Sequence, residues 1–114
     1  MMSEISAYEA FNQVDMRVGK VVRVEINEEA KKPAYKIWID LGGELGERTT
    51  SAQYTALYQP EQLVGQSVVC AVNLGTRRIA GFKSEVLMLG VQQIEGSVVY
   101  LTTEREVTPG TKVF

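Results

Sequence analysis

The sequence predicts an all-β fold, a small and partly open antiparallel barrel that carries a short amino-terminal helix and a short inserted helix. Two observations lead to this prediction. Several short segments are rich in β-branched and aromatic residues, and some alternate apolar with polar positions as half-buried strands do. Glycine and proline separate these segments at the short intervals that turns require. A chain of 114 residues suffices for one compact domain, so we expect residues 1–114 to form a single domain.

The amino-terminal part predicts a helix and then a long strand. Ser6 followed by Glu9 is a capping-box pattern, which predicts a helix over residues 7–13. From there the apolar period changes to two, which predicts a strand over residues 16–26, and Gly19 is expected to mark a bulge or bend in it. The alternation places one set of apolar side chains on a single face: Met16, Val18, Val22, Val24 and Ile26.

The next segments predict a second strand, a third strand and a helical connection. Residues 35–41 alternate apolar with polar side chains, and the glycine pair at 42–43 is expected to close this strand with a turn. Residues 47–53 are rich in Thr and Ser and compatible with a short strand. Residues 54–63 contain Pro60, which favours the first turn of a helix, so we expect a helical connection across one end of the sheet.

The carboxy-terminal half predicts further strands. Residues 67–74 and 86–91 are almost continuously apolar, which is typical of strands that are covered on both faces. Residues 98–101 add another short strand. The tail, residues 107–114, contains a Pro-Gly pair and is expected to form a turn followed by a last short strand.

Composition excludes several kinds of chemistry. The chain has no histidine and one cysteine, so it offers no Ser-His or Cys-His couple and no histidine-ligated metal site. We also find no carboxylate pair with distinct environments and no glycine-rich phosphate loop, and we therefore expect no catalytic residues, metal or cofactor. Cys70 lies in an apolar run, where burial should leave it inert.

The cysteine content and the hydropathy of the chain favour a cytoplasmic protein. A single cysteine fits a reducing compartment. The amino terminus lacks the basic flank and apolar stretch of a signal peptide, and no apolar run is long enough to cross a bilayer. We expect a soluble, cytoplasmic protein without membrane insertion.

Charges are segregated although the net charge is only -2. No acidic residue lies between Glu61 and Glu85, and this stretch contains three cations, Arg77, Arg78 and Lys83. A second run without acidic residues contains Lys31, Lys32 and Lys36. These residues are either solvated loop charges or a local basic surface for a ligand.

A few residues stand out as candidates for binding. Trp38 shares the polar face of its strand with Lys36, where it either packs on a neighbouring element or a partner subunit, or forms a platform for a ligand. Short uncharged polar residues interrupt segments that otherwise favour strands: Ser51, Gln53, Asn73 and Ser84. They either satisfy backbone groups at strand ends or bind the backbone or phosphates of an extended ligand.

Several motifs resemble a known family over about residues 15–90. DMRVGK at 15–20, SAQ at 51–53, LVG at 63–65, NL at 73–74 and GFKS at 81–84 are similar to the transfer RNA-binding domain of some aminoacyl-tRNA synthetases and free-standing relatives. Within that family, KPAYK at 32–36, SAQYT at 51–55 and AGFKSEVL at 80–87 resemble the CsaA branch, small bacterial proteins regarded as export-related chaperones.

This resemblance implies an oligonucleotide-binding-fold barrel and a homodimer. Family members of this size dimerise through the amino-terminal helix and the carboxy-terminal strands, which implies that residues 1–13 and about 92–114 are dimerisation extensions. The expected interface residues are apolar side chains that a bare barrel does not need: Tyr8, Phe11, Val113 and Phe114.

Two functions compete, beside the alternative of a purely structural dimerisation domain. The first is a chaperone that binds unfolded or export-bound polypeptides, with the export machinery as a further partner. The alternative is a tRNA-binding protein. An acid at Glu85 and the acidic balance depart from the tRNA-binding pattern and favour the chaperone. For either ligand, the expected binding residues are Lys36, Trp38, Ser51, Gln53, Asn73, Arg77, Arg78, Phe82, Lys83, Ser84 and Met88.

Overall fold

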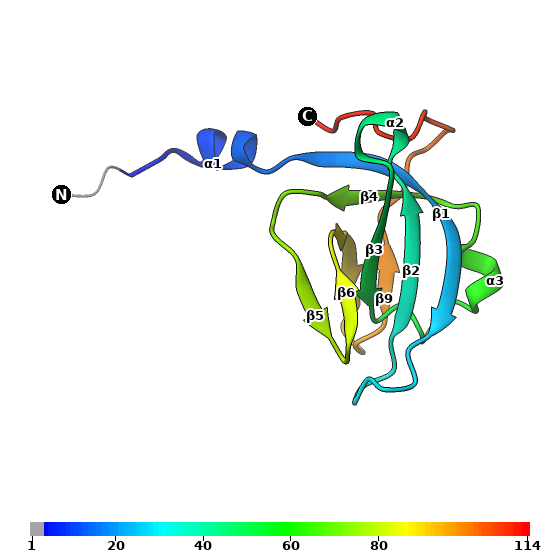
Figure 1. Cartoon of the computed structure of the whole chain (residues 1–114). Coiled ribbons are helices and arrows are strands. Elements are labelled where there is room, and N and C mark those ends of the chain that lie inside the picture. Colours follow the sequence, from blue (N-terminus) through cyan, green and yellow to red (C-terminus); the bar gives the residue numbers. More distant parts are fainter. Residues whose placement is uncertain (1–3) are drawn as a thin grey trace.

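A nearly closed, five-stranded antiparallel barrel forms the body of the molecule (Figure 1). The structure is a computed structural model that describes residues 4–114. The barrel sheet has the order β3-β2-β1-β4-β7. Its strands are β1 (Met16–Ile26), β2 (Tyr35–Asp40), β3 (Glu47–Ala52), β4 (Ser67–Ala71) and β7 (Leu87–Met88). The prediction of a small all-β barrel is therefore confirmed.

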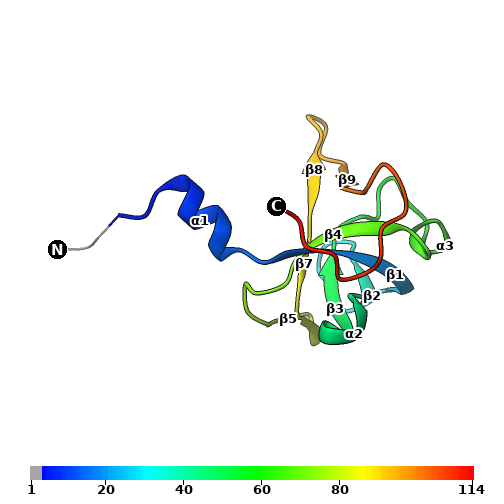
Figure 2. The ribbon, with the colours of Figure 1, turned by 90° about the horizontal axis from the view of Figure 1, so that it is seen from above.

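Three short helices and two hairpins complete the fold. The helices are α1 (Ala7–Gln13), α2 (Gly42–Leu45) and α3 (Pro60–Leu63). The hairpins are β5 (Arg77–Ile79) with β6 (Phe82–Ser84), and β8 (Gly90–Gln92) with β9 (Val98–Tyr100). Seen from above, the β8–β9 hairpin and α1 both project from the barrel (Figure 2). None of the helices in residues 4–114 combines the length and apolar character needed to cross a membrane.

The barrel interior consists mainly of buried apolar side chains. Ile37 and Ile39 of β2 are fully buried, while the intervening Lys36 and Trp38 are only partly covered, so the strand alternates as predicted. Leu63 of α3 is also fully buried. Cys70 of β4 has no exposed surface, and burial raises the pKa of its thiol to about 12.

The prediction for β1 is wrong in one respect, because the strand changes face halfway. The register with β2 shifts between Val21 and Arg23, so the bulge lies at this point and not at Gly19. Val21 is therefore buried, whereas Val22 is 42% exposed and Ile26 is 62% exposed. Gly19 has a different role, since a Cβ atom there would lie 2.5 Å from Ile39 Cγ2. The glycine lets β2 approach closely.

The carboxy-terminal half departs most from the sequence prediction. The expected strand over residues 67–74 ends at Ala71, and Leu74 is 56% exposed. The expected strand over residues 86–91 splits into β7 and β8, which belong to different sheets. Leu87 and Val91 are each 50% exposed, so this segment is not covered on both faces. The residues expected to form a turn at 42–43 begin the short helix α2 instead.

Helix α1 forms as predicted but does not pack on the barrel in the part of the chain that the structure describes. The Ser6 hydroxyl caps the helix by accepting from the Glu9 amide at 3.1 Å. None of the helical residues is buried, and both views show α1 clear of the barrel (Figures 1 and 2). The first three residues of the expected extension 1–13 lie outside the described part.

Asn73 fixes the junction between α1 and the barrel. Its side-chain carbonyl accepts from the Asp15 amide, and its side-chain NH2 donates to the Gln13 carbonyl, both at 2.8 Å. The direction of the helix is therefore set by two hydrogen bonds.

The carboxy-terminal tail runs beside the start of β1. The Val113 amide donates to the Met16 carbonyl at 2.8 Å, and the Val18 amide donates to the Thr111 carbonyl at 2.9 Å. The predicted last strand is reduced to one isolated bridge, between Arg17 and Lys112. Both ends of the chain therefore meet at β1, close to where α1 departs.

Candidate ligand-binding surfaces

A groove opens between β3 and β7 because the barrel closes at only one point there. Four antiparallel pairings separate these strands through the sheet, so β3 and β7 run in the same direction. They meet at Thr49, whose carbonyl accepts from the amides of Glu85 at 2.7 Å and Val86 at 3.3 Å. Beyond Thr49 the structure contains a hollow of about 680 Å³, which we call the groove.

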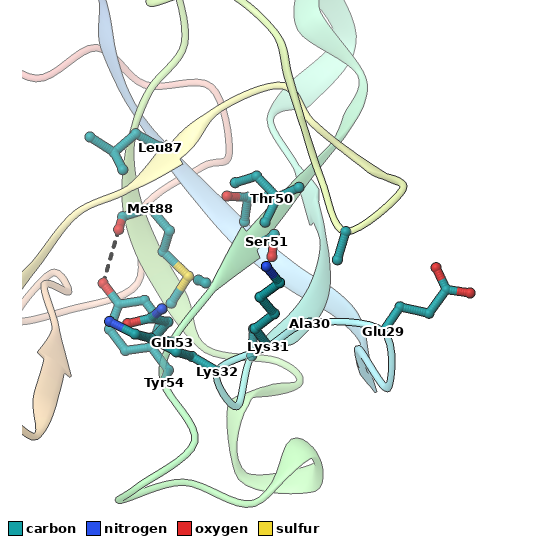
Figure 3. A pocket seen from close by; sticks show the side chains of 14 residues that line it. Glu29, Ala30, Lys31, Lys32, Thr50, Ser51, Gln53, Tyr54, Leu87 and Met88 are labelled. Atoms are coloured by element: carbon teal, nitrogen blue, oxygen red, sulfur yellow. Dashed lines mark hydrogen bonds between the residues drawn. The ribbon is translucent and has the colours of Figure 1, made fainter.

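The groove is lined mainly by apolar side chains. Leu87 and Met88 form one wall, and Ile79 and Ala80 reach in from the tip of the β5–β6 hairpin. Residues 50–54 form the opposite wall. Lys31 and Lys32 border the groove, and the Lys31 amine extends toward Ser51 (Figure 3). The groove thus combines an apolar interior with a basic rim.

Tyr54 lines the groove beside Met88. Its ring is buried, and its hydroxyl donates to the Met88 carbonyl at 2.9 Å (Figure 3). Burial raises the pKa of this hydroxyl to about 12. Gly90 leaves room for the tyrosine, because a Cβ atom there would lie 2.3 Å from the Tyr54 hydroxyl. The Tyr54 side chain therefore holds the end of β7 in addition to the ladder with β4.

A smaller hollow of about 210 Å³ continues the groove on the other side of Leu87. Its lining includes Arg77, Ser84 and the exposed Leu74. Thr50, Ser51, Ile79 and Leu87 line both hollows, so the two form one elongated depression along the β5–β6 hairpin.

The hairpin is attached to β3 through side chains. The Thr49 hydroxyl lies 2.7 Å from the Lys83 carbonyl and 2.9 Å from Glu85 Oε1, and these two oxygens share its single donor hydrogen. The Ser51 amide donates to Ser84 Oγ at 3.2 Å. Glu85 is thus a structural residue at this junction, and its carboxylate also accepts from the Thr49 amide. The acid that departs from the tRNA-binding pattern holds the barrel together here.

The outer face of β2 presents a second surface of a different kind. Trp38 and Phe82 pack edge to face with ring centroids 5.4 Å apart. The guanidinium of Arg23 lies 4.4 Å from the Trp38 ring centroid, and Lys36 Nζ lies 5.4 Å from the Phe82 ring centroid. We call these four residues the aromatic–cation cluster.

Exposed cations continue this surface onto the hairpin. The hairpin turns at Ala80 and Gly81, which both have positive φ, as a type I′ turn requires. Arg78 and Lys83 are paired across the two strands and are exposed. None of the ion pairs within residues 4–114 involves Arg77, Arg78 or Lys83. Their charges are therefore free to meet a ligand.

The structure divides the predicted binding residues between these surfaces. The groove and its continuation contain Ser51, Gln53, Arg77, Ser84 and Met88. The cluster and the adjoining hairpin contain Lys36, Trp38, Arg78, Phe82 and Lys83. Asn73 belongs to neither, because both ends of its amide bind backbone groups beside α1. The predicted binding residues are therefore distributed over two neighbouring surfaces and the α1 junction.

Sequence reasoning missed four residues that shape these surfaces. Leu87 and Ile79 supply the exposed apolar walls of the groove, but their segments had been interpreted as covered strand or charged loop. Lys32 is named only within a run of cations and is not among the expected binding residues, although it lies in a family-like motif that could have selected it. Arg23 lies in the expected strand over residues 16–26 but in none of the motifs, and only the tertiary structure brings it over Trp38.

The predicted interface residues differ in exposure. Tyr8 is 76% exposed and Phe11 is 43% exposed, both on the isolated helix α1. Phe114 is fully exposed, whereas Val113 is partly covered beside β1.

Within residues 4–114, no three Asp, Glu, Cys or His side chains gather in a way that could hold a metal ion.

Comparison with known proteins gives consistent matches. The sequence pattern of the family described as "Putative tRNA binding domain" matches residues 16–112. A Methionine--tRNA ligase from Methanococcus vannielii is 36% identical over 110 residues, which is 96% of this chain. The chain spans only 16% of the length of that relative.

Two of the solved structures that match cover nearly the whole chain. The crystal structure of chaperone CsaA from Bacillus anthracis is 44% identical with a TM-score of 0.89, and the match covers 97% of this chain and 100% of that one. The CsaA chaperone protein from Picrophilus torridus is 37% identical with a TM-score of 0.89, and the match covers 96% of this chain and 100% of that one.

Proposed function

The chain belongs to the tRNA-binding-domain family, and we propose that this member is a non-catalytic chaperone that holds unfolded polypeptide in the groove between β3 and β7. The observation that carries the proposal is the apolar groove itself, with Leu87 50% exposed and Ile79 39% exposed on its two sides. Its likeness to CsaA structures over the whole chain supports the same function.

The groove suits clients of varied sequence. Leu87 and Ile79 would each contribute about 1 kcal/mol if a client covered their exposed halves. Met88 also lines the groove, and although only 3% of its surface is exposed, its unbranched side chain can repack beneath a client. Weak, adaptable apolar contacts favour the broad client range that a chaperone needs.

Binding to an unfolded protein at two salt concentrations tests this function. We expect labelled, reduced and carboxymethylated lactalbumin to bind, and the affinity to persist at high salt because apolar burial is not screened. Fluorescence anisotropy measures both conditions. Failure to bind at either salt concentration would contradict the proposal.

We further propose that the protein acts as a homodimer. Tyr8 and Phe11 lie on a helix that is too short to be stable alone and has no buried residue. Phe114, in the carboxy-terminal extension, is fully exposed. A second copy would cover these side chains. Light scattering should give a dimer mass at micromolar concentration, and deletion of residues 1–13 should shift the mass to that of a monomer.

The clients that we propose are unfolded or export-bound precursors in the cytoplasm, which the protein would deliver to the export machinery. Photo-crosslinking in cells from an unnatural residue at position 87 would identify them. Recovery of precursors together with export components supports this assignment, and recovery of neither contradicts it.

A second candidate function is tRNA binding on the aromatic–cation cluster. Two aromatic rings flanked by Arg23 and Lys36 are the combination on which unpaired bases stack while cations meet phosphates. Family membership supports the same ligand. A filter-binding titration with tRNA should show affinity that falls steeply as salt rises, and salt-independent binding would exclude this surface.

A further inference from the structure

We propose that the polypeptide binds by strand addition, as a short extended segment that pairs with the exposed edge of β3 at Ser51 and Gln53. This inference rests on the proposed chaperone function, and it goes further by assigning the main chain of the client as the recognised group. It explains how clients without a common sequence are held in one place, since every unfolded polypeptide has the same backbone.

The edge of β3 is open along the groove. Thr49 turns its amide and carbonyl away from β2, because both bind the Glu85 region. Residues two apart in a strand point the same way, so Ser51 also faces outward, as its amide shows by donating to Ser84 Oγ. Within residues 4–114 the Ser51 carbonyl and the Gln53 amide, which follow along the same edge, have no hydrogen-bond partner.

These two groups match a single residue of an extended chain. The Ser51 carbonyl can accept an amide hydrogen, and the Gln53 amide can donate to a carbonyl. In a sheet, such alternate groups on one edge pair with the main chain of the neighbouring strand. Side chains of the added strand would point alternately toward the apolar walls at Ile79, Leu87 and Met88 and out to solvent.

Polypeptide fits this groove better than nucleic acid does. Stacking of bases needs an accessible aromatic face, but Tyr54, the aromatic residue among those lining the groove, is 4% exposed and its hydroxyl is bound to Met88. The accessible rings, Trp38 and Phe82, belong to the aromatic–cation cluster. The groove therefore offers apolar walls and backbone groups, which are the two features that an extended peptide uses.

The charge at the rim of the groove should favour clients that carry an acidic residue. Lys31 and Lys32 border the groove and take part in none of the ion pairs within residues 4–114. Glu29 lies on the same loop and also lines the groove, but its side chain points away from Ser51 in Figure 3, so the rim has two cations and one acid. We therefore expect an acidic residue beside the apolar segment of the client to improve binding.

Hydrogen exchange tests the pairing on the unmodified protein. The probe is a labelled peptide of alternating valine and threonine with one terminal glutamate, and its affinity is measured by fluorescence anisotropy. The Gln53 amide should exchange quickly in the free protein and at least about tenfold more slowly with saturating peptide, because pairing protects it. The Arg48 amide, which lies on β3 away from the groove, serves as the internal control.

Two N-methylated versions of the same peptide provide the matched comparison. One is methylated on alternate residues and the other on the intervening residues, so only one of them loses the amide hydrogens that face β3. That peptide should bind roughly three- to tenfold more weakly per lost hydrogen bond, and the other should bind as the parent does.

The outcomes separate the two proposals. If the parent peptide binds but the Gln53 amide stays unprotected and both methylated peptides bind equally, strand addition is overturned and the chaperone function stands. If neither this peptide nor unfolded lactalbumin binds, the chaperone function fails and strand addition fails with it. Protection of Gln53 together with a loss in only one methylated peptide supports both.

Discussion

The groove and the aromatic–cation cluster both adjoin the β5–β6 hairpin, but their chemistry differs. In the groove, apolar side chains and unpaired backbone groups of β3 face a hollow. In the cluster, Arg23, Trp38, Phe82 and Lys36 already contact one another, so the surface is filled and charged. The first surface is suited to desolvated, extended polypeptide, and the second to phosphates and bases.

This difference teaches that one barrel can separate two kinds of ligand without separate domains. The hairpin contributes Ile79 to the groove and Phe82 to the cluster, which are paired across its two strands. Substitutions in one of the two surfaces should therefore change the binding of one ligand and leave the binding of the other intact. Five predictions test this division and the strand behind the groove, from the largest expected effect to the smallest.

A charge in the wall of the groove should abolish polypeptide binding. Leu87→Asp should weaken the affinity for unfolded lactalbumin about a hundredfold, since a carboxylate would have to be desolvated against an apolar client. Because Leu87 is 50% exposed, the barrel should still fold. The control is Ile26→Asp, at a position that is 62% exposed and lies outside the groove. Equal losses for both variants would break the comparison.

Removal of the stacking ring should affect tRNA alone. Trp38→Ala should weaken tRNA binding about tenfold, in line with roughly 1–3 kcal/mol for one base stacked on an aromatic ring. Polypeptide affinity should be unchanged, because Trp38 is on the outer face. Trp38→Phe, which keeps an aromatic face, should retain most of the affinity. A loss of polypeptide binding in the alanine variant would show that the two surfaces are not independent.

The stability of β4, the strand that pairs with β7, depends on the burial of Cys70. Cys70 pairs with Met88 across β4 and β7 and has no exposed surface. Cys70→Ser should lower the free energy of unfolding by about 1–3 kcal/mol, because it buries a hydroxyl without an assured partner. Denaturant titration measures the change, and the native thiol should react slowly with a thiol reagent. Rapid labelling would contradict the burial of this strand.

The same thiol makes a prediction for pH. Its pKa is raised in the folded state from 9.0 to about 12, so the unfolded state loses the proton first as pH rises. The stability contributed by the neutral thiol is complete below pH 9.0 and is lost progressively toward pH 12. Cys70→Ala should reduce this alkaline loss of stability, and an unchanged slope would contradict the assignment.

The smallest expected effect concerns single exposed cations. Arg78→Ala and Lys83→Ala should each lower the salt slope of tRNA binding by about one unit, with a modest loss of affinity. Both residues are exposed on the hairpin. Binding of lactalbumin should not change, and a changed polypeptide affinity would extend the polypeptide site onto the cluster side.

Sequence alone predicts the parts of this molecule that depend on local pattern. The cap at Ser6, the alternation of residues 35–41 and the buried Cys70 follow from periodicity and burial, and the structure has all three. The bulge in β1 could not be placed, because the face change at Val21–Arg23 is set by pairing with β2 and leaves the composition of the strand unremarkable.

The candidate site was harder to predict than the fold. Family-like motifs selected residues from the correct segments, but they could not show that Ser51 lines the groove while Trp38 packs on Phe82. Asn73 was selected as a ligand-binding residue, and only its two hydrogen bonds reveal its contact with the junction of α1. The open edge of β3 leaves no sequence signal, since it arises where two parallel strands diverge in space.

Chemical-shift mapping of the isotope-labelled protein with unfolded lactalbumin tests the central claim, that polypeptide occupies the groove. At low and at high salt, we predict changes at the amides of Ser51, Gln53, Ile79 and Leu87, with Trp38 and Phe82 unaffected. If the changes instead centre on Trp38 and Phe82 and disappear at high salt, the groove is not the polypeptide site, and both ligands share the aromatic–cation cluster.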